Sequence, residues 1–577
     1  MERLEAKKVN GHVYYYYSEW GRKGGKCRRL RQKYLGSLKD MVAMVTGESN
    51  APICAEVFAW GLPKALWEEV SRSDLTAVVN EVCPKRQQGL TTGEYLAIAA
   101  LNRASQPCSK RSMWDWFSHT VLTRDIAQAK EDALTSQRFW DHMNRIGEQE
   151  AAEIWKRVFQ GVIRREAVDP ASISYDGTNF YTFIDTFNSR CEIARRGKNK
   201  QGRENLRQVS YALFCCADGP LPLYYDIYAG NRNDAKQFPV MLKKFQDFFQ
   251  ETAGAQCRAE NVTLVFDKGN NSQDNFALLD TLELSYVGSV KLDEHKELAL
   301  ESNASDRFVP CLDQHLEGTK AFRIRKVVYG KERVLVVTYN PNLFAAQWKT
   351  VQSDMARAME KLGQLAVKLD NRRLGLVTGG RKPAVEPVTR HVAGILSRQH
   401  MKDVIQTSIG TEGEDIRLRY AINPESVERL KDTYLGKNIL VTDRQAWDND
   451  KVIRAYRSQY LIEGIFKEMK DRSHGNWWPL YHWTDSKIRV HALYCTLALL
   501  FRGLMMRRLT RGGLRLSLQR VMRELEEIQE VKNIFPAQEK NGRGRRKAPL
   551  VQYVLTKMTE TQEKIVSILG LSEKKPV

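Results

Sequence analysis

Residues 171–183, ASISYDGTNFYTF, alternate between apolar and polar side chains and carry an aspartate, Asp176, within the run. Alternation with a period of two predicts a β-strand with one buried face. An ionised carboxylate in such a strand is costly to remove from water unless it has a partner or a task. The alternative is an Asp near a turn that pairs with a neighbouring Lys or Arg. This strand is the starting point for both the fold and the first candidate site residue.

The segments that follow continue a mixed α/β order. Residues 207–228 predict a hairpin that turns at Asp218 and Gly219, and QFPVMLKKFQDFFQE predicts an amphipathic helix. NVTLVFD is typical of a buried strand that ends on Asp267, and a helix capped by Asn271 or Ser272 and a further strand come next. Three strands, a helix, a strand, a helix and a strand is the order of an RNase H-like mixed sheet. Asp267 is therefore a second candidate, again with local pairing as the alternative.

A strongly basic loop separates the first strand from the hairpin. The stretch CEIARRGKNKQGRENLRQ, residues 191–208, holds only two acids, Glu192 at its start and Glu204. We expect a phosphate backbone to bind here, beside the two aspartates. The basic residues of the loop are Arg195, Arg196, Lys198, Lys200, Arg203 and Arg207.

Residues 448–471, DNDKVIRAYRSQYLIEGIFKEMKD, predict one amphipathic helix whose start Asp448 or Asn449 can cap. Its apolar side carries Leu461, Ile465 and Met469, which we expect to pack on the sheet. The alternative for the opposite side is an ordinary solvated face. The opposite side is a polar stripe. At about 100° per residue it contains Tyr456, Gln459, Tyr460, Glu463, Lys467 and Lys470.

The overall charge favours a polyanionic partner. The 577 residues contain 90 Lys and Arg against 69 Asp and Glu, which gives a net charge of +21. Nucleic acid is the leading partner, and an anionic membrane surface is the competitor. The longest apolar run, residues 492–501, is shorter than the ~20 residues that cross a bilayer, and there is no apolar signal core, so we expect a soluble cytoplasmic protein.

Several enzyme classes lose support from missing motifs. Ten cysteines include no C-x-x-C pair and are typical of reduced core residues. Neither H-E-x-x-H nor G-x-x-x-x-G-K-[ST] occurs, which argues against zinc hydrolases and nucleotide hydrolases.

The remaining segments predict further domains around the α/β core. Residues 12–34 predict a hairpin with a Gly-rich turn and a basic second strand, which is either a phosphate-contacting ribbon or a solvated edge strand. Residues 539–547, EKNGRGRRK, are either a phosphate-contacting loop or a solvated linker. The expected order is an N-terminal basic hairpin (1–50), a helical DNA-binding region (51–165), a first catalytic part (166–299), an inserted β-rich domain (300–435), a second catalytic part with the Glu463 helix (436–510) and a helical C-terminal region (511–577).

Three carboxylates on separate elements, Asp176, Asp267 and Glu463, suit a two-metal phosphoryl-transfer site, because hard oxygen ligands hold Mg²⁺. These residues resemble the DDE transposases of bacterial insertion sequences, in the branch named for a Tyr-Arg-Glu-Lys signature helix. Tyr456, Glu463 and Lys470 match that signature at the required spacing, and Gln459 stands where the family has Arg. YDGTNFY and VFDKGNNS look like the neighbourhoods of the two catalytic aspartates.

The resemblance implies an RNase H-like catalytic domain with a β insertion and cut-and-paste transposition. The three carboxylates would hold two Mg²⁺ ions, for which Mn²⁺ substitutes, while Tyr456 and Lys470 would touch phosphates. Gln459 would lack the charge and fork geometry of Arg. An aromatic residue of the insertion would meet a flipped base; Trp348 is one candidate, with a core position as the alternative.

The implied partners are the double-stranded DNA of the element ends and of the target, with a homodimer in the synaptic complex and no membrane. The enzyme would act at the bacterial nucleoid. Two other functions fit the same residues. One is an RNase H-like nuclease or resolvase that only cuts, and the other is a captured transposase that binds DNA without catalysis.

Overall fold

The computed structural model describes residues 2–9, 11–23, 26–46, 52–85, 88–169, 171–199, 202–253, 262–380, 382–412, 415–472, 475–535 and 550–572. The chain forms two compact units. One unit contains residues 1–80, 84–142 and 504–577, and the other contains residues 81–83 and 143–503. The N-terminal and C-terminal regions therefore share a unit, and the two predicted catalytic parts share the other.

The larger unit is built on a nine-stranded sheet in the order β10-β11-β12-β15-β9-β8-β5-β6-β7. The part of the sheet with the order β9-β8-β5-β6-β7 is the one expected of an RNase H-like fold. In it β6 is antiparallel to both β5 and β7, while β8 and β9 run parallel to β5. The predicted fold class is confirmed. The strands are β5 (Ser172–Thr182), β6 (Arg207–Cys216), β7 (Leu221–Ala229), β8 (Thr263–Phe266) and β9 (Ser285–Val290).

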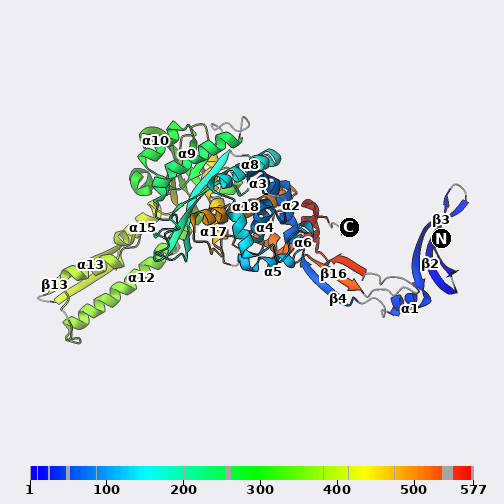
Figure 1. Ribbon diagram of the computed structural model, residues 1–577. Coiled ribbons are helices and arrows are strands. Elements are labelled where there is room, and N and C mark those ends of the chain that lie inside the picture. The colour runs from blue at the N-terminus through cyan, green and yellow to red at the C-terminus, as the bar shows by residue number, and fades with distance from the viewer. Residues whose placement is uncertain are drawn as a thin grey trace. The chain divides into compact units, whose positions relative to one another are not determined.

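Helices cover both faces of this sheet. On one face lies α9 (Asp234–Ala253), where the Phe238 ring is 5.1 Å from both Tyr175 of β5 and Phe266 of β8. On the other face α16 (Asn449–Arg457) packs against β8 and β9, and α17 (Gln459–Lys470) packs against β5 and β6. Figure 1 shows α9 and α17 on opposite sides of the strands. Two further helices of this region are α8 (Glu148–Glu166) and α10 (Gln273–Thr281), the latter capped by Ser272 as predicted.

The predicted helix over 448–471 is two helices. α16 begins after Asp448, whose carboxylate accepts a hydrogen bond from the Lys451 amide at 2.7 Å, as expected of a cap. α16 ends at Arg457, Ser458 lies between the helices, and α17 begins at Gln459. The break matters for the apolar side, because the buried residues of α17 are Ile462, Ile465, Phe466 and Met469, whereas Leu461 is only half-buried.

The expectation of a β-rich insertion over 300–435 was wrong in two respects. The hairpin of β11 (Lys320–Val328) and β12 (Lys331–Tyr339) belongs to the large sheet, because β12 pairs with β15 (Lys437–Thr442), which pairs with β9. The short β10 (Val309–Pro310) completes that edge. The segment that does leave the sheet is mostly helical. It contains α12 (Pro341–Arg373), α13 (Val385–Ile395), α14 (Met401–Val404), the hairpin β13 (Ile405–Glu412) and β14 (Asp415–Ile422), and α15 (Pro424–Thr433).

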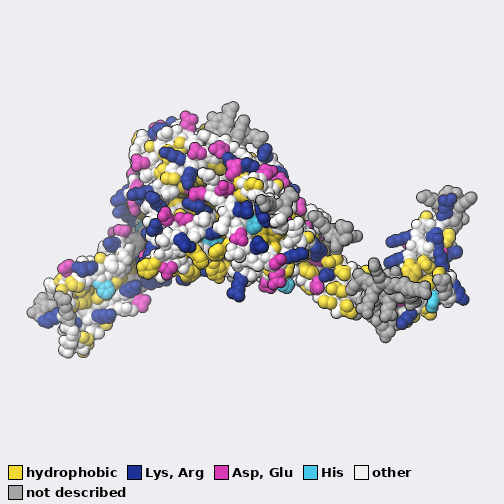
Figure 2. All heavy atoms as spheres, in the orientation of Figure 1, with side chains coloured by type: hydrophobic (Ala, Val, Ile, Leu, Met, Phe, Trp, Pro, Cys, Tyr) yellow, Lys and Arg dark blue, Asp and Glu magenta, His cyan; other side chains and the backbone are white. Residues whose placement is uncertain are grey.

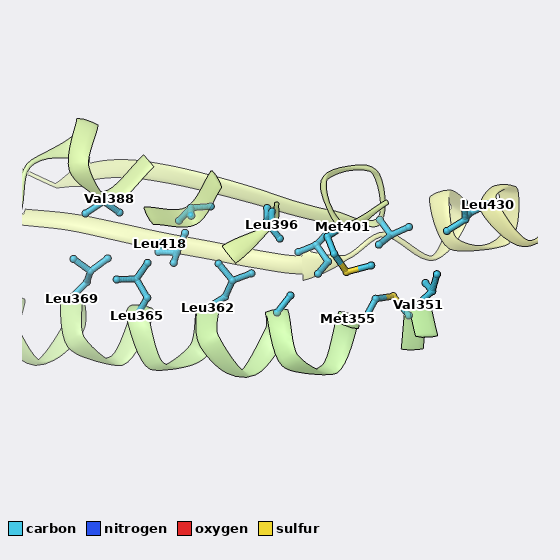
Figure 3. Packing of buried hydrophobic residues seen from close by; sticks show 14 of the residues in the cluster. Val351, Met355, Leu362, Leu365, Leu369, Val388, Leu396, Met401, Leu418 and Leu430 are labelled. Carbon is cyan, nitrogen blue, oxygen red and sulfur yellow. The ribbon is translucent and has the colours of Figure 1, made fainter. Parts of the chain in front are cut away.

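We call residues 341–435 the arm, because they form a projection with its own hydrophobic core. Figure 3 shows Met355, Leu362 and Leu365 of α12 pointing toward Met401 and Leu418 from the other elements of the arm. Trp348 packs against this cluster, and the Lys431 Nζ lies 5.3 Å from its ring centre. Trp348 is thus half-buried against the core of the arm, and its contact with a flipped base stays a prediction.

The other unit contains the predicted helical region and two small sheets. Its helices include α2 (Gly61–Arg72), α3 (Leu75–Val82), α4 (Thr92–Ala104) and α5 (Met113–Ser118), and Ser109 caps a short 3₁₀ turn over Lys110–Ser112. β4 (Cys54–Ala59), β16 (Gln529–Phe535) and β17 (Leu550–Leu555) form one sheet. The predicted basic tract of residues 539–547 lies outside the described residues, as does Lys200.

The N-terminal hairpin has a third strand. β1 (Glu2–Val9), β2 (His12–Lys23) and β3 (Lys26–Ser37) form an antiparallel sheet, followed by α1 (Leu38–Thr46). The predicted turn at Gly24 and Gly25 lies outside the described residues.

The long helix α18 (Asp485–Arg511) is apolar and long enough to cross a membrane by length and composition. However, 94% of its most apolar window is buried inside the protein. This is the burial of a core helix.

Candidate active site

Two of the three predicted carboxylates are neighbours across parallel strands. Tyr175 of β5 pairs with Phe266 of β8, so the next residues along each chain, Asp176 and Asp267, are one step further in the same register. Adjacent strands are about 4.8 Å apart. Since Tyr175 and Phe266 both face α9, the alternation of side chains directs Asp176 and Asp267 to the opposite face of the sheet.

Each aspartate is oriented by the backbone that follows it. Asp176 Oδ1 accepts a hydrogen bond from the Gly177 amide at 2.7 Å, and Asp267 Oδ1 accepts one from the Lys268 amide at 2.7 Å. Asp267 also caps the 3₁₀ turn over Lys268–Asn270. Asp176 is half-buried and Asp267 is exposed. The two carboxylates thus differ in solvation while sharing one face of the sheet.

Two hydrogen bonds hold the Glu463 helix over this same face. The hydroxyls of Ser458 and Ser174 lie 3.2 Å apart, and Lys470 Nζ donates to Thr178 Oγ1. Asp176 lies between Ser174 and Thr178 on β5, and Glu463 lies between Ser458 and Lys470 on α17. The apolar residues of α17 are buried beneath it, and Glu463 is exposed. The helix is therefore fixed at both ends with Asp176 opposite its middle.

Tyr456 is hydrogen-bonded to the strand beside β8. Its hydroxyl donates to Ser289 Oγ of β9 at 2.8 Å. Burial raises the pKa of the Tyr456 phenol, and the negative charges of Asp267 and Glu463 raise it further. Both carboxylates are thus close enough to influence the same hydroxyl. The three predicted residues therefore lie on the same side of the sheet, since α17 covers the face to which Asp176 and Asp267 are directed.

The donor set suits a hard divalent cation, because it consists of carboxylate oxygens. In the part of the chain that the structure describes, no three His, Cys, Asp or Glu side chains form a group that already surrounds one ion. The three carboxylates are close in the fold without being gathered as ligands.

The residues predicted to contact DNA differ in how far they are exposed to solvent. Tyr456 is half-buried and bonded to Ser289, and Lys470 is half-buried beside Thr178. Gln459 is half-buried at the first turn of α17. In the basic loop Arg195, Arg196, Lys198 and Arg203 are exposed, as a phosphate contact requires.

Arg207 was predicted wrongly as a DNA contact. Its side chain is 6% exposed, and the guanidinium donates to the backbone oxygens of Asp185 and Asn188 at 2.8 and 3.0 Å. It also donates to the oxygens of Cys191 and Ala194. A guanidinium carries five donors in a fixed fork, so it can close a loop onto the sheet in this way. Arg207 shapes the basic loop instead of contacting its ligand.

The structure adds a cavity that the sequence did not predict. Its volume is about 660 Å³, and it is lined by Lys268, the residue after Asp267, and by Lys291, Arg398 and Lys437 among others. These four cations come from four separate segments of the chain. A local sequence pattern therefore could not predict that they line one cavity.

Comparison with known proteins places the chain in a family. Residues 168–500 match the family described as the transposase DDE domain, which covers more than half of the 577 residues. The chain belongs to this family. It is a DDE transposase, an enzyme that cleaves DNA and joins DNA strands in transposition. The matched range contains Asp176, Asp267 and Glu463.

Solved transposase structures resemble this transposase at low sequence identity. The piggyBac transposase synaptic complex with hairpin DNA is 11% identical, with coverage of 81% of this chain and 78% of that chain and a TM-score of 0.34. A pre-cleavage Mos1 transpososome is 12% identical, with coverage of 35% and 60% and a TM-score of 0.15. No curated protein matches the transposase.

Proposed function

We propose that this transposase binds the terminal inverted repeats of an insertion sequence, hydrolyses the phosphodiester at each end and joins the freed 3′-OH to target DNA. The observation that carries the proposal is the shared face of the sheet. Asp176 and Asp267 are register neighbours there, and α17 is bonded over it through Ser174 and Thr178 with Glu463 between the two bonds.

We assign the metal-binding role to Asp176, Asp267 and Glu463, with two Mg²⁺ ions as the natural cofactor and Mn²⁺ as a substitute. The chemistry that such a pair supplies is activation of the attacking oxygen and stabilisation of the leaving oxygen. The protein supplies the position of the carboxylates, and Tyr456 and Lys470 lie at the two ends of the same surface to hold the DNA backbone.

We also place the chain in the insertion-sequence branch with the Tyr-Arg-Glu-Lys signature. Tyr456, Glu463 and Lys470 support this placement by their spacing, and Gln459 departs from it. Gln459 can donate a neutral hydrogen bond to phosphate but lacks the charge of Arg. Two element ends must be held together, so we expect a dimer on DNA, acting in the bacterial cytoplasm at the nucleoid.

The first experiment removes one carboxylate at a time. Asp176→Asn, Asp267→Asn and Glu463→Gln should each reduce Mg²⁺-dependent cleavage of a duplex that carries the element end by at least about 100-fold, because a metal ligand is lost. Binding to the same duplex without metal should change little. Glu386→Gln, an exposed carboxylate of the arm, is the matched control. Full cleavage by any of the three variants would refute the assignment of that residue.

A second experiment separates a transposase of element ends from a nuclease. A duplex labelled at the 3′ end of the element is incubated with target plasmid and Mg²⁺. We expect the label to appear in the plasmid. Cleavage without transfer would favour the nuclease or resolvase, and binding with neither product would favour the captured DNA-binding protein.

A further inference from the structure

The N-terminal sheet of β1, β2 and β3 has two faces of different character. Residues that pair across antiparallel strands share a face, so the registers assign each side chain to one of them. One face, which we call the closed face, carries Arg3, Glu5, Lys7, Tyr14, Tyr16, Ser18, Trp20, Arg29, Gln32 and Tyr34. The other, which we call the open face, carries Glu2, Leu4, Ala6, Lys8, Val13, Tyr15, Tyr17, Glu19, Arg28, Arg31 and Lys33.

The polar groups of the closed face are occupied by one another. Glu5 accepts hydrogen bonds from Trp20 at 2.9 Å, from Gln32 at 3.1 Å and from Arg29 at 3.2 Å. The hydrogen bond from Trp20 is the main reason that the pKa of Glu5 is lowered. Lys7 Nζ lies 4.9 Å from the Tyr16 ring centre, and Tyr16 packs edge-on against Tyr34. The cations of this face therefore already have partners.

The cations of the open face are different. Within the described part of the chain, the side chains of Lys8, Arg28, Arg31 and Lys33 make no hydrogen bond, ion pair or ring contact, and all four residues are exposed. Glu19 lies opposite Arg31, but its carboxylate accepts from the Tyr17 hydroxyl at 3.1 Å. Figure 2 shows Lys and Arg side chains along this N-terminal sheet. Cationic side chains held in register on a paired strand are suited to an external polyanion.

The dimensions fit duplex DNA. Three strands about 4.8 Å apart span about 10 Å, which is within the ~12 Å width of the major groove. Arg28, Arg31 and Lys33 follow one strand of the sheet, so they can meet successive phosphates along a groove wall. Residues 1–46 also lie outside the range that matches the transposase family, residues 168–500. A separate DNA contact here would add to the catalytic surface.

We propose that the open face of the N-terminal sheet binds the major groove of duplex DNA, with Arg28, Arg31 and Lys33 as phosphate contacts. This rests on the proposed function only in that the natural duplex would be an element end. Binding itself needs neither metal nor cleavage, so it can fail or succeed independently of the catalytic assignment.

The test uses the full chain and a duplex taken from the sequence that flanks its gene, without metal. The triple variant Arg28→Ala, Arg31→Ala and Lys33→Ala should bind at least about 10-fold more weakly at 100 mM salt, and the slope of log affinity against log salt should fall by about 2.7, since each lost phosphate contact contributes about 0.9. The closed-face triple Arg3→Ala, Lys7→Ala and Arg29→Ala removes the same charge and should change affinity by less than about 3-fold. Equal losses in both variants, or none in the first, would overturn the proposal.

A second measurement needs no substitution. Bound duplex should protect Lys8 and Lys33 of the wild-type chain from acetylation, measured by mass spectrometry, while Lys7 on the closed face stays as reactive as in the free protein. Protection of Lys7 without protection of Lys33 would overturn the proposal even if a variant failed to fold. Loss of metal-dependent cleavage in the wild type, with this protection intact, would instead count against the proposed function.

Discussion

Single residues in this transposase show why a basic side chain cannot be assigned to DNA from charge alone. Arg207 and Arg203 belong to the same basic loop, only four positions apart. Arg203 is exposed, with its guanidinium 5.0 Å from the Tyr181 ring centre, whereas Arg207 is buried among backbone oxygens. Sequence gives both the same charge, and only the fold of residues 185–194 around Arg207 separates them.

Arg207→Lys should therefore destabilise the protein although the charge is kept. A single ammonium cannot reach the four carbonyl groups that the guanidinium satisfies, and unsatisfied buried groups cost about 1 to 3 kcal/mol each. We expect a loss of about 3 kcal/mol, visible as a lower melting temperature and faster proteolysis within residues 183–206. Arg203→Lys is the control and should leave both unchanged. An unaltered melting temperature for Arg207→Lys would show that the loop does not depend on it.

Lys437 gives a prediction about pH. It is 2% exposed, and burial lowers its pKa to about 8 from an ordinary value of 10.5. Below pH 8 it is charged in both the folded and unfolded states, and the burial cost is fully present. Between pH 8 and 10.5 only the unfolded state keeps the proton, so the free energy of unfolding rises with pH, by up to about 3 kcal/mol.

Lys437→Met removes this titration. The difference in melting temperature between the wild type and Lys437→Met should therefore shift in favour of the wild type between pH 7.5 and 9.5. Tyrosines and cysteines that titrate in this range are present in both proteins, so their effects cancel. A difference that is constant with pH would contradict the lowered pKa.

At the scale of elements, α17 shows how packing positions a functional residue. Met469 is 0% exposed beneath the helix, while Lys467 lies exposed on the same helix. Met469→Ala should destabilise the protein by about 2 to 5 kcal/mol, because it leaves a cavity under α17. Since that helix also carries Glu463, cleavage of end DNA should fall as well. Lys467→Ala should leave the melting temperature unchanged, and an unaffected melting temperature for Met469→Ala would contradict the packing described.

The elements also show what sequence could and could not predict. The strands β5 and β8, the caps at Asp448 and Ser272 and the turn at Asp218 and Gly219 depend on local chemistry, and local patterns predicted them. The break at Ser458 did not follow from periodicity, because both helices continue the same apolar spacing. At the break, Ser458 is hydrogen-bonded to Ser174, a residue 284 positions away, and such a contact cannot be predicted from a local pattern.

The same limit applied to the insertion. The hairpin of β11 and β12 was predicted as a hairpin, but its membership of the large sheet depends on the pairing of Tyr339 with Lys437, across the whole arm. Such a pairing is decided by tertiary structure. The carboxylates could be predicted because each lies at a distinctive local position. The hydrogen bonds that join Lys470 to Thr178 and Ser458 to Ser174 could not be predicted, because they link residues far apart in the sequence.

At the scale of the whole molecule, the arm is a module inserted between two adjacent strands. Its ends meet, because the Asn340 amide donates to the Gly436 oxygen at 2.8 Å. The buried residues of its core all come from residues 351–435, so its packing is complete without the sheet. A segment with adjacent ends and its own core has the properties of a domain that can fold alone.

Residues 340–436 expressed alone should therefore fold and unfold cooperatively in urea, as small single domains do. Within this fragment Leu362→Ala should cost about 2 to 5 kcal/mol, because Leu362 is 0% exposed at the centre of the core seen in Figure 3. Val367→Ala, at a position 57% exposed on the same helix, should change the urea midpoint little. A fragment without cooperative unfolding, or equal effects of the two substitutions, would mean that the arm depends on the sheet for its structure. Cooperative unfolding with the expected difference would establish that the catalytic sheet and the arm are separate folding units joined at Asn340 and Gly436.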